Sequence, residues 1–485
     1  MPDQPSGSST VWRRLLLGAV LIVFASATAT TAAGFREIDR VVTAFRDGEI
    51  LDLGESLAEA ESGQPQTLML IGSDERPKKD VNYEKESRSD TIILVRLDPA
   101  RAATSILSLP RDLKVTVPGF GTRKLNAAYE KGGPRLALET VKRLTGLRIN
   151  HVVNVDFSGF RRAVNAIGCA YVDIDRRYFN DNSGFGAGYE TIDVPQGYQR
   201  VCGEDALDYV RYRHEDNDLV RAARQQEFLR QAKQQVSAGD LLSDRRRLIK
   251  IFGRYTSSDI RSRAEVVRLV KLAASSAGRP VGEVHFKGEI GATYVTASSA
   301  AIKKLTQEFL GSEATKGPRG KARSERQPRR TRRLSRRRNA PVPLDDASVE
   351  GRIQGEAARA RGSRIPVYYP TARAPASLFL RDPRVYAITA PGGRAFSSYR
   401  MTLKADEIGQ YYGIQGTAWK DAPILSGPAE EERRGERTFE VFKDGDRVRL
   451  VAWRTPQGVY WVSNTLLQTL SERQMLAIAE STRPL

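Results

Sequence analysis

The stretch QTLMLIGSDER at residues 66–76 decides the fold, because a short apolar run that ends at a glycine before charged residues is typical of a buried strand. Further strand-like runs lie at residues 91–97, 104–109, 151–155 and 171–174. Helical patterns alternate with them, at residues 134–144, 157–167, 203–212, 219–236, 245–252, 263–274 and 300–309. This alternation predicts an α/β domain over residues 66–311, with helices on both faces of a mixed central sheet.

The last part of the chain differs in pattern and predicts a small accessory α+β domain over residues 362–485. Asp444-Gly445 favours a hairpin turn, and Ser471 is suited to cap a final helix over residues 472–480. Trp453 and Trp461 are expected in its core. Its strand-like runs lie at residues 364–369, 384–389, 438–443, 447–454 and 459–463.

The composition excludes several classes of protein. A hydrophobic fraction of 40% excludes a wholly disordered chain, and 485 residues allow two or three domains with real cores. The three histidines, His151, His214 and His285, are far apart, and the two cysteines have no CxxC spacing. A thiolate–imidazole metal cluster is therefore excluded, and any metal is expected on oxygen ligands.

Much of the net charge of +19 lies in one segment. Residues 316–338 hold twelve Lys and Arg and one acid, a local charge of +11. So few apolar residues predict a basic disordered linker, which we extend over residues 312–361. Two interpretations stay open: a solvated linker, or an arm that binds polyanions such as anionic lipid, nucleic acid or phosphate-rich glycopolymers.

The N-terminus predicts export of the chain. Residues 15–33 form an uncharged apolar run of 19 between Arg13-Arg14 and Arg36, long enough to cross a bilayer as a helix. The arginine pair places a tail of residues 1–14 in the cytoplasm and the chain after residue 33 outside, with residues 34–65 as a linker. We expect a single-pass cell-membrane protein without a nucleic-acid partner. A cleaved signal peptide is the alternative, and it exports the chain as well.

Charged residues lie beside the predicted strands of the first domain. Asp74 follows one strand and Asp90 precedes the next, so both carboxylates are candidates for one end of the sheet. Two carboxylates placed there would bind a hard cation such as Mg²⁺. Arg211 and Arg213 are spaced by two and share a face where the chain is extended.

A predicted helix carries the other candidates. Arg221 and Gln225 are four apart on one face of the helix, which Asp218 is suited to cap. One guanidinium group binds two phosphate oxygens at once. Several arginines beside a carboxylate-bound cation therefore favour a pyrophosphate as the ligand.

The order and spacing of these motifs resemble the LytR-CpsA-Psr family of Gram-positive cell envelopes, over about residues 66–236. This resemblance implies a phosphotransferase that attaches a glycopolymer from a polyprenyl-pyrophosphate carrier to peptidoglycan. The chain departs from the family's common aromatic-glycine pair at Leu219-Val220. The motifs are GSDER at 72–76, RSDT at 88–91, LPRD at 109–112, KLN at 124–126, VDF at 155–157, ALDYVRYR at 206–213 and DLVRAARQQ at 218–226.

The resemblance also implies roles for single residues. Asp74 and Asp90 would bind Mg²⁺, the expected cofactor. Asp218 would orient or deprotonate the acceptor hydroxyl, and with it Arg111 and Arg221 would form the catalytic set. The residues that would bind the pyrophosphate are Arg88, Arg111, Lys124, Arg211, Arg213, Arg221 and Gln225.

Two other functions stay open. A polyprenyl-pyrophosphate hydrolase would use the same site with water as the acceptor. A non-catalytic envelope-binding or regulatory protein, similar to a transcriptional attenuator, belongs to a different class. The predicted cytoplasmic tail of residues 1–14 is too short to fold as a DNA-binding domain.

Export lets Cys169 and Cys202, the only two cysteines, form a disulfide, whereas two buried free thiols are the alternative. A disulfide predicts that neither cysteine of the unfolded protein is alkylated until a reductant is added. Mass spectrometry measures this, and alkylation without reductant would contradict the pairing.

Replacing Arg111 or Arg221 by alanine is expected to abolish glycopolymer transfer while the fold survives, because each change removes a cation that faces the phosphate. A transfer assay on purified protein measures the effect. A variant with full activity would contradict the assignment of the site.

Overall fold

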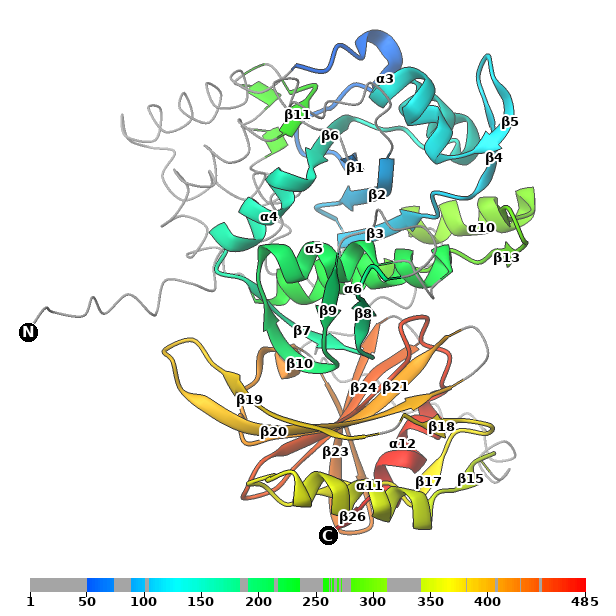
Figure 1. Cartoon of the computed structure of the whole chain (residues 1–485). Helices are drawn as coiled ribbons and strands as arrows, with labels where there is room; N and C mark the ends of the chain where they lie inside the picture. Colours follow the sequence, from blue (N-terminus) through cyan, green and yellow to red (C-terminus); the bar gives the residue numbers. More distant parts are fainter. Residues whose placement is uncertain are drawn as a thin grey trace, which may run out of the picture. The chain divides into compact units, whose positions relative to one another are not determined.

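The computed structural model describes most of the chain from residue 50 onward, and these residues fall in two compact units (Figure 1). The described residues of the first unit lie within 50–173, 177–311 and 389–394, and those of the second lie within 174–176, 342–388 and 395–485. The described ranges are 50–73, 89–100, 104–183, 191–212, 217–235, 256–260, 281–311, 342–380, 382–405, 409–427, 429–444 and 447–485, with scattered residues between 262 and 272.

A six-stranded mixed sheet lies at the centre of the first unit. Strand β1 pairs in parallel with β6 and antiparallel with β2, which in turn pairs antiparallel with β3. The predicted mixed sheet is therefore confirmed. Its order is β11 (Thr256–Ser258), β6 (His151–Asp156), β1 (Gln66–Ser73), β2 (Ser89–Leu97), β3 (Thr104–Leu109) and β12 (Val281–Val284).

Helices cover both faces of this sheet. On one face, α3 (Asn126–Thr145) and α10 (Ser299–Leu310) share a core cluster with Ile92 and Leu107. On the other face, Gln225 of α6 (Asp218–Gln234) hydrogen-bonds Thr91 and Ser108. Thr91 and Ser108 are sequence neighbours of Ile92 and Leu107, and neighbours in a strand point to opposite faces. Helices α4 (Phe157–Ala166) and α5 (Gly203–Arg211) complete the unit.

Helix α3 begins before the predicted helical run at residues 134–144. Gly132 and Gly133 leave helical geometry, with Gly133 at a φ of 59°, and Pro134 opens the second part of the helix. Glycine adopts this left-handed backbone without a steric penalty. The apolar periodicity is interrupted at the same point, so the sequence pattern detects only the second part.

Most of the short strands outside the central sheet were not predicted, because runs of two to five residues carry too little alternation to be recognised. They form the pairs β4 (Lys114–Val117) with β5 (Gly121–Lys124), β7 (Ala170–Ile174) with β10 (Gly197–Val201), β8 (Tyr178–Asn180) with β9 (Ile192–Val194), and β13 (Glu289–Ile290) with β14 (Val295–Thr296). Only β7 was predicted among them. The predicted helix at 245–252 and most of that at 263–274 lie outside the described residues.

The second unit contains an eight-stranded sheet whose strands pair antiparallel. Helices α11 (Ser348–Ala360) and α12 (Glu472–Ser481) contribute to its core, where Trp453 and Trp461 are buried as predicted. Ser471 caps α12 as predicted, in a capping box with Gln474. The sheet runs β18 (Leu378–Phe379), β20 (Ala395–Lys404), β21 (Tyr411–Thr417), β25 (Val459–Ser463), β24 (Arg447–Arg454), β23 (Arg437–Asp444) and β22 (Glu430–Arg434), with β19 (Arg384–Thr389) beside β20.

Shorter elements complete the description. They are the 3-10 turns η2 (Gly54–Ser56) and η3 (Pro423–Leu425) and the two-residue strands β15 (Asp345–Asp346), β16 (Tyr368–Tyr369), β17 (Ala372–Arg373) and β26 (Arg483–Pro484).

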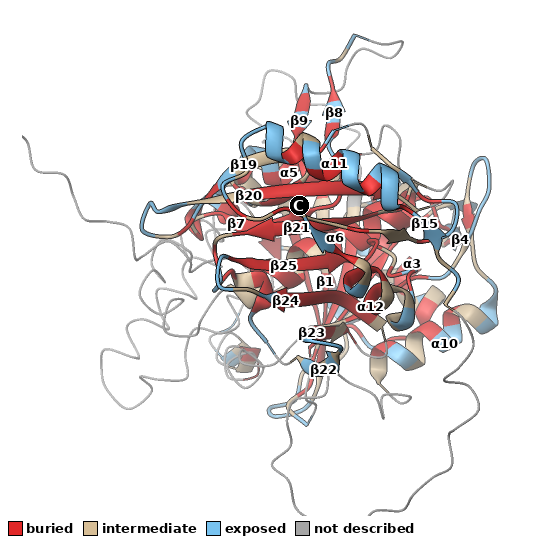
Figure 2. Cartoon of the chain, turned by 90° about the horizontal axis from the view of Figure 1, so that it is seen from below, coloured by how far each residue is buried: buried red, intermediate tan, exposed pale blue. Residues whose placement is uncertain are grey.

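Both predicted linkers are too long. Helix α11 lies inside the predicted disordered segment 312–361, and Figure 2 shows its buried and exposed sides. Its buried side is made by Gly351, Gln354, Gly355 and Ala358, which give no hydrophobic periodicity, and Gly355 lies against the Tyr369 ring. Leu53, within the predicted linker 34–65, is buried in the core of the first unit.

The predicted membrane anchor, residues 15–33, and the tail before it lie outside the described residues. Within the described part of the chain, no helix combines the length and the apolar character that a bilayer crossing requires.

The predicted disulfide is confirmed: Cys169 is bonded to Cys202, with their Cα atoms 4.4 Å apart. Cys169 lies directly before β7, and Cys202 is the N-cap residue of α5. The bond therefore fixes the start of α5 to the chain that leaves α4.

Replacing both cysteines by serine is expected to lower the free energy of unfolding by about 3 to 4 kcal/mol, because the bond closes a long loop in the unfolded chain. Urea unfolding of the double variant beside the oxidised wild type measures the loss. Equal stability of the two proteins would contradict the expectation.

Candidate functional site

The ends of four strands meet at one edge of the central sheet. Ser73 at the end of β1 pairs with Ser89 at the start of β2 and with Asp156 at the end of β6. Ile92 of β2 pairs with Leu109, the last residue of β3. The segments that follow β1 and β3 and precede β2 carry the first group of predicted site residues.

Some of these residues cannot be placed. Asp74, Arg88 and Arg213 lie outside the described residues, and only the backbone of Asp90 is described, within β2. Their roles stay predictions.

Two buried hydroxyl groups at this edge have no hydrogen-bond partner within the part of the chain that the structure describes. The side chains of Ser73 and Ser89 are fully buried, and among the described residues neither Oγ atom has a hydrogen-bond partner. A buried hydroxyl without a partner costs free energy, so such groups call for an ordered water, ion or ligand. Hydroxyl groups are suitable partners both for a hydrated cation and for a phosphate group. The hydroxyls thus fit the kind of ligand that the sequence predicts here.

Asp218 is the first residue of α6 rather than its cap. Asn217 caps the helix, because its side chain accepts hydrogen bonds from the N–H groups of Leu219 and Val220, both at 3.0 Å. The buried Asp218 carboxylate accepts a hydrogen bond from the Asp112 N–H at 3.0 Å and forms an ion pair with Arg221. It thereby links the start of α6 to the loop after β3.

Arg111 and Lys124 come together around Asp112. The Asp112 Oδ1 atom lies 3.2 Å from Lys124 Nζ and 3.9 Å from Arg111 Nε. The hairpin of β4 and β5 brings Lys124 back to this point, where the Asn126 N–H donates to the Arg111 carbonyl. Asp112 was not predicted as a site residue, although its place after Arg111 in LPRD was the available signal.

Arg211 is the last residue of helix α5, whereas Arg213 lies outside the described residues, so their common face stays a prediction. The Arg211 guanidinium carbon lies 3.9 Å from the centroid of the Phe157 ring, which fixes the orientation of the planar group. Arg221 and Gln225 both lie on α6, four residues apart on one face, as predicted.

The carboxylate of Asp156 lies at the same sheet edge, and Asp156 was not predicted as a site residue. It caps α4 by accepting the Gly159 N–H at 2.6 Å. Burial raises the pKa of Asp156, against the lowering effect of the Gly159 and Ser158 N–H groups. Its contacts are those of a structural cap.

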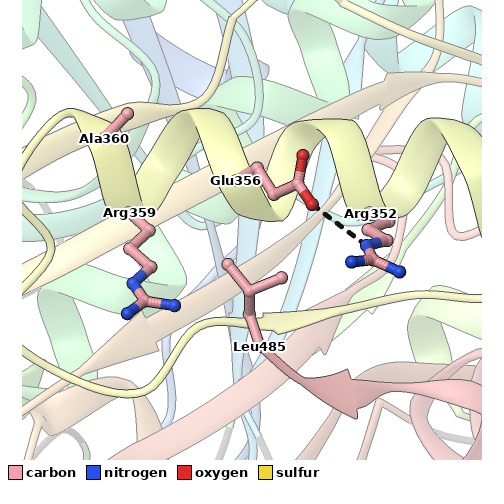
Figure 3. A pocket seen from close by; sticks show the side chains of 5 residues that line it. All are labelled: Arg352, Glu356, Arg359, Ala360 and Leu485. Carbon is pink, nitrogen blue, oxygen red and sulfur yellow. Dashed lines mark hydrogen bonds and ion pairs between the residues drawn. The ribbon is translucent and has the colours of Figure 1, made fainter.

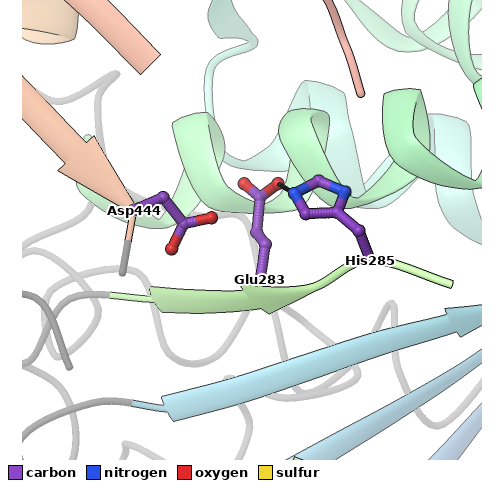
Figure 4. Close-up of side chains that lie close together, drawn as sticks. All are labelled: Glu283, His285 and Asp444. Atoms are coloured by element: carbon purple, nitrogen blue, oxygen red, sulfur yellow. Dashed lines mark ion pairs between the residues drawn. The ribbon is translucent and has the colours of Figure 1, made fainter. Parts of the chain in front are cut away.

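Two further features, one in each unit, involve polar side chains. In the second unit, a hollow of about 600 Å³ is lined by α11 and Leu485, where Arg352 pairs with Glu356 at 3.0 Å (Figure 3). In the first unit, Glu283 of β12 lies 3.6 Å from His285 (Figure 4) and 2.7 Å from the Arg230 guanidinium. Neither feature contains a predicted site residue.

Comparison with known proteins identifies relatives of this chain. Residues 37–309, more than half of the chain, match the model of the LytR_cpsA_psr family. The polyisoprenyl-teichoic acid–peptidoglycan teichoic acid transferase TagU of Oceanobacillus iheyensis is 28% identical over 254 residues, which cover 50% of this chain and 75% of that protein. The probable cell wall biosynthesis protein LcpB of Corynebacterium glutamicum is 35% identical over 170 residues, which cover 33% of this chain and 39% of that protein.

Among solved structures, the crystal structure of Bacillus subtilis TagV is similar to this chain. The two share 25% sequence identity with a TM-score of 0.41, and the match covers 52% of this chain and 98% of that chain.

The described contacts change the expectation for Arg221→Ala. Its removal leaves the buried Asp218 carboxylate without its cation, which is expected to cost about 3 to 5 kcal/mol of folding stability. Arg111→Ala leaves Asp112 paired with Lys124, so we expect a loss below about 1 kcal/mol. Denaturant unfolding of both variants measures the difference, and equal losses would contradict this account.

Proposed function

The chain belongs to the LytR-CpsA-Psr family, and on this basis we propose that it is an extracytoplasmic phosphotransferase that attaches a glycopolymer from a polyprenyl-pyrophosphate carrier to peptidoglycan. The relatives named as teichoic acid transferases support a transferase. The observation that carries the proposal is the cluster of Arg111, Lys124, Asp218 and Arg221 at the sheet edge. Anchoring to the cell membrane by residues 15–33 is part of the proposal.

The proposed reaction exchanges one phosphorus–oxygen bond for another. The acceptor hydroxyl oxygen of peptidoglycan bonds to the phosphorus that carries the glycopolymer, and the bond from that phosphorus to the carrier phosphate breaks. Polyprenyl phosphate leaves with the bonding electron pair, and the hydroxyl proton passes to solvent or a base. No nucleotide is required, because the pyrophosphate bond supplies the driving force.

The cationic side chains of the cluster suit this reaction. Phosphoryl transfer requires alignment of the reacting oxygens and neutralisation of charge on the phosphate, with little covalent help from the protein. Arg111 and Lys124 have side chains that are 19% and 34% exposed, so their donors reach both Asp112 and the edge of the site. We assign them to the phosphate oxygens.

Asp218 is better suited to hold Arg221 than to accept a proton. One carboxylate oxygen receives the Asp112 N–H, and the other is paired with Arg221. Both carboxylate oxygens are thereby engaged by protein donors. We therefore infer that Asp218 orients Arg221 and the acceptor.

Asp74 and Asp90 would hold Mg²⁺, which would supply positive charge to the pyrophosphate oxygens and lower the charge on the leaving group. The hydroxyls of Ser73 and Ser89, adjacent in sequence to Asp74 and Asp90, support a polar ligand at this edge.

The alternatives differ in the acceptor and in the products. A hydrolase would release polyprenyl phosphate and a free phosphorylated polymer, and an envelope-binding protein would release neither. The buried ion pair and the partly exposed cations of the cluster are compatible with both transfer and hydrolysis, so products must be measured.

Full-length protein in detergent, given a lipid-pyrophosphate glycan analogue and peptidoglycan oligosaccharides with Mg²⁺, is expected to form a covalent polymer–peptidoglycan conjugate and to stop when the metal is chelated. Mass spectrometry identifies the products. Free phosphorylated polymer without conjugate would assign a hydrolase, and binding without turnover would contradict an enzyme.

Lys124→Ala is expected to lower kcat/KM for transfer by about 100-fold, because one charge-assisted contact to the phosphate is lost. Arg123→Ala is the matched control: it removes the neighbouring cation of β5, which is exposed and bonds only the Thr122 carbonyl among the contacts described. Equal losses in the two variants would contradict a specific role for Lys124.

A further inference from the structure

Two neighbouring side chains of α6 hold the backbone on both sides of Arg211. The Arg224 Nη2 atom donates to the carbonyl of Tyr212, directly after Arg211. Gln225 Nε2 donates to the carbonyl of Val210, directly before it, at 3.2 Å. The end of α5, which carries Arg211, is thus linked to α6 on either side of that residue. Helices α5 and α6 lie side by side (Figure 1).

Arg224 is rigidly held. Its side chain is fully buried, and its guanidinium carbon lies 4.6 Å from the ring centroid of Tyr178, 5.7 Å from that of Tyr209 and 6.0 Å from that of Tyr212. The Tyr178 ring packs edge-on against the other two rings, with centroids 5.4 and 5.0 Å away. A cation among aromatic faces with a hydrogen bond to a carbonyl has little freedom to move.

Tyr212 is fixed from a third direction. Its hydroxyl donates to the Phe179 carbonyl at 3.1 Å, which links the residue after Arg211 to β8. The backbone next to Arg211 is therefore fixed by α6 and by β8 together.

Gln225 has no donor left for a phosphate. Its side-chain N–H groups are used by Thr91 Oγ1 at 2.7 Å and by the Val210 carbonyl, and its Oε1 atom lies 3.4 Å from Ser108 Oγ. A glutamine amide has two N–H donors, so both are engaged within the protein. The side chain is also buried, which favours a role between protein elements.

We propose that Arg224 and Gln225 are positioning residues that form an Arg211 clamp: they hold the Val210 and Tyr212 carbonyls so that the Arg211 guanidinium, stacked on Phe157, meets the pyrophosphate in one orientation. Gln225, in this proposal, acts on Arg211 and does not contact the phosphate. The inference rests on the proposed function, because it takes the pyrophosphate as the ligand of Arg211.

The chemistry of the clamp requires arginine at position 224. A guanidinium stacks on aromatic rings and reaches a carbonyl with its outer nitrogen, whereas a lysine ammonium is shorter and more strongly hydrated. Arg224→Lys keeps the charge but is expected to release the Tyr212 carbonyl, and small displacements of a positioning group cost rate steeply.

The test is a double-mutant cycle in the full-length protein. Arg224→Lys is expected to lower kcat/KM for transfer and the affinity for octaprenyl pyrophosphate, measured by calorimetry, by about 100-fold. In an Arg211→Ala background the same change is expected to cost less than about threefold, because the group that it positions is gone. If the two substitutions lowered kcat/KM by independent factors, so that the factors multiplied in the double variant, the clamp would be overturned.

Gln225→Glu provides a second variant that keeps the shape of the side chain and removes its N–H donors. The clamp predicts that its effect also disappears in the Arg211→Ala background. If Gln225 instead bound the phosphate, Gln225→Glu would lower the affinity for octaprenyl pyrophosphate in the Arg211→Ala background by as much as in the wild type. This result would overturn the assignment of Gln225.

Arg230→Lys is the matched control, since Arg230 is another buried arginine of α6 and is paired with Glu227 and Glu283. It is expected to lower the melting temperature while kcat/KM changes by less than about twofold. A wild type that does not bind octaprenyl pyrophosphate would overturn the proposed function along with the clamp. Equal affinities of the wild type and the Arg224→Lys variant for octaprenyl pyrophosphate would overturn the clamp alone.

Discussion

The ion pair between Asp218 and Arg221 is the interaction on which the rest of the site depends. Both side chains are buried, and the same carboxylate accepts the Asp112 N–H. It therefore sets the distance between the start of α6 and the loop after β3, where Arg111 and Asp112 lie. Without the guanidinium the carboxylate would be a buried charge without compensation, so removal of either partner alone is expected to be destabilising.

Helix α6 is held mainly by polar contacts, although it is almost entirely buried. Arg224 bonds α5, Gln225 bonds β2 and β3, Gln226 bonds the Val284 carbonyl, and Arg230 pairs with Glu283. A buried polar network of this kind defines one arrangement more sharply than apolar packing, because each displaced partner leaves an unpaired group. The cost is a helix whose sequence shows no clear apolar face. Precise placement of its arginines is the corresponding benefit for a phosphate site.

Sequence reasoning recovered the parts of the fold that have strong periodicity. Strands β1, β2, β3 and β6, helices α4 and α5, and the Ser471 cap follow from apolar spacing and capping residues. Helix α11 was missed because glycine, glutamine and alanine make its buried side, and the β4–β5 hairpin was missed because its strands are short. Asn217 rather than Asp218 caps α6, since either residue type suits the cap and only the backbone geometry selects one.

The sequence by itself determined the membership in an α/β class, the pairing of its only two cysteines, and which charged residues are candidates for the site. These depend on periodicity and on residue identity, which are local properties. Only the tertiary structure decided that Asp218 holds Arg221, that Lys124 and Arg111 meet at Asp112, and that Gln225 is fully used by protein groups. Those roles depend on which atoms of distant segments come within hydrogen-bond distance, and a hydrogen bond is decided by tenths of an ångström that no residue spacing encodes.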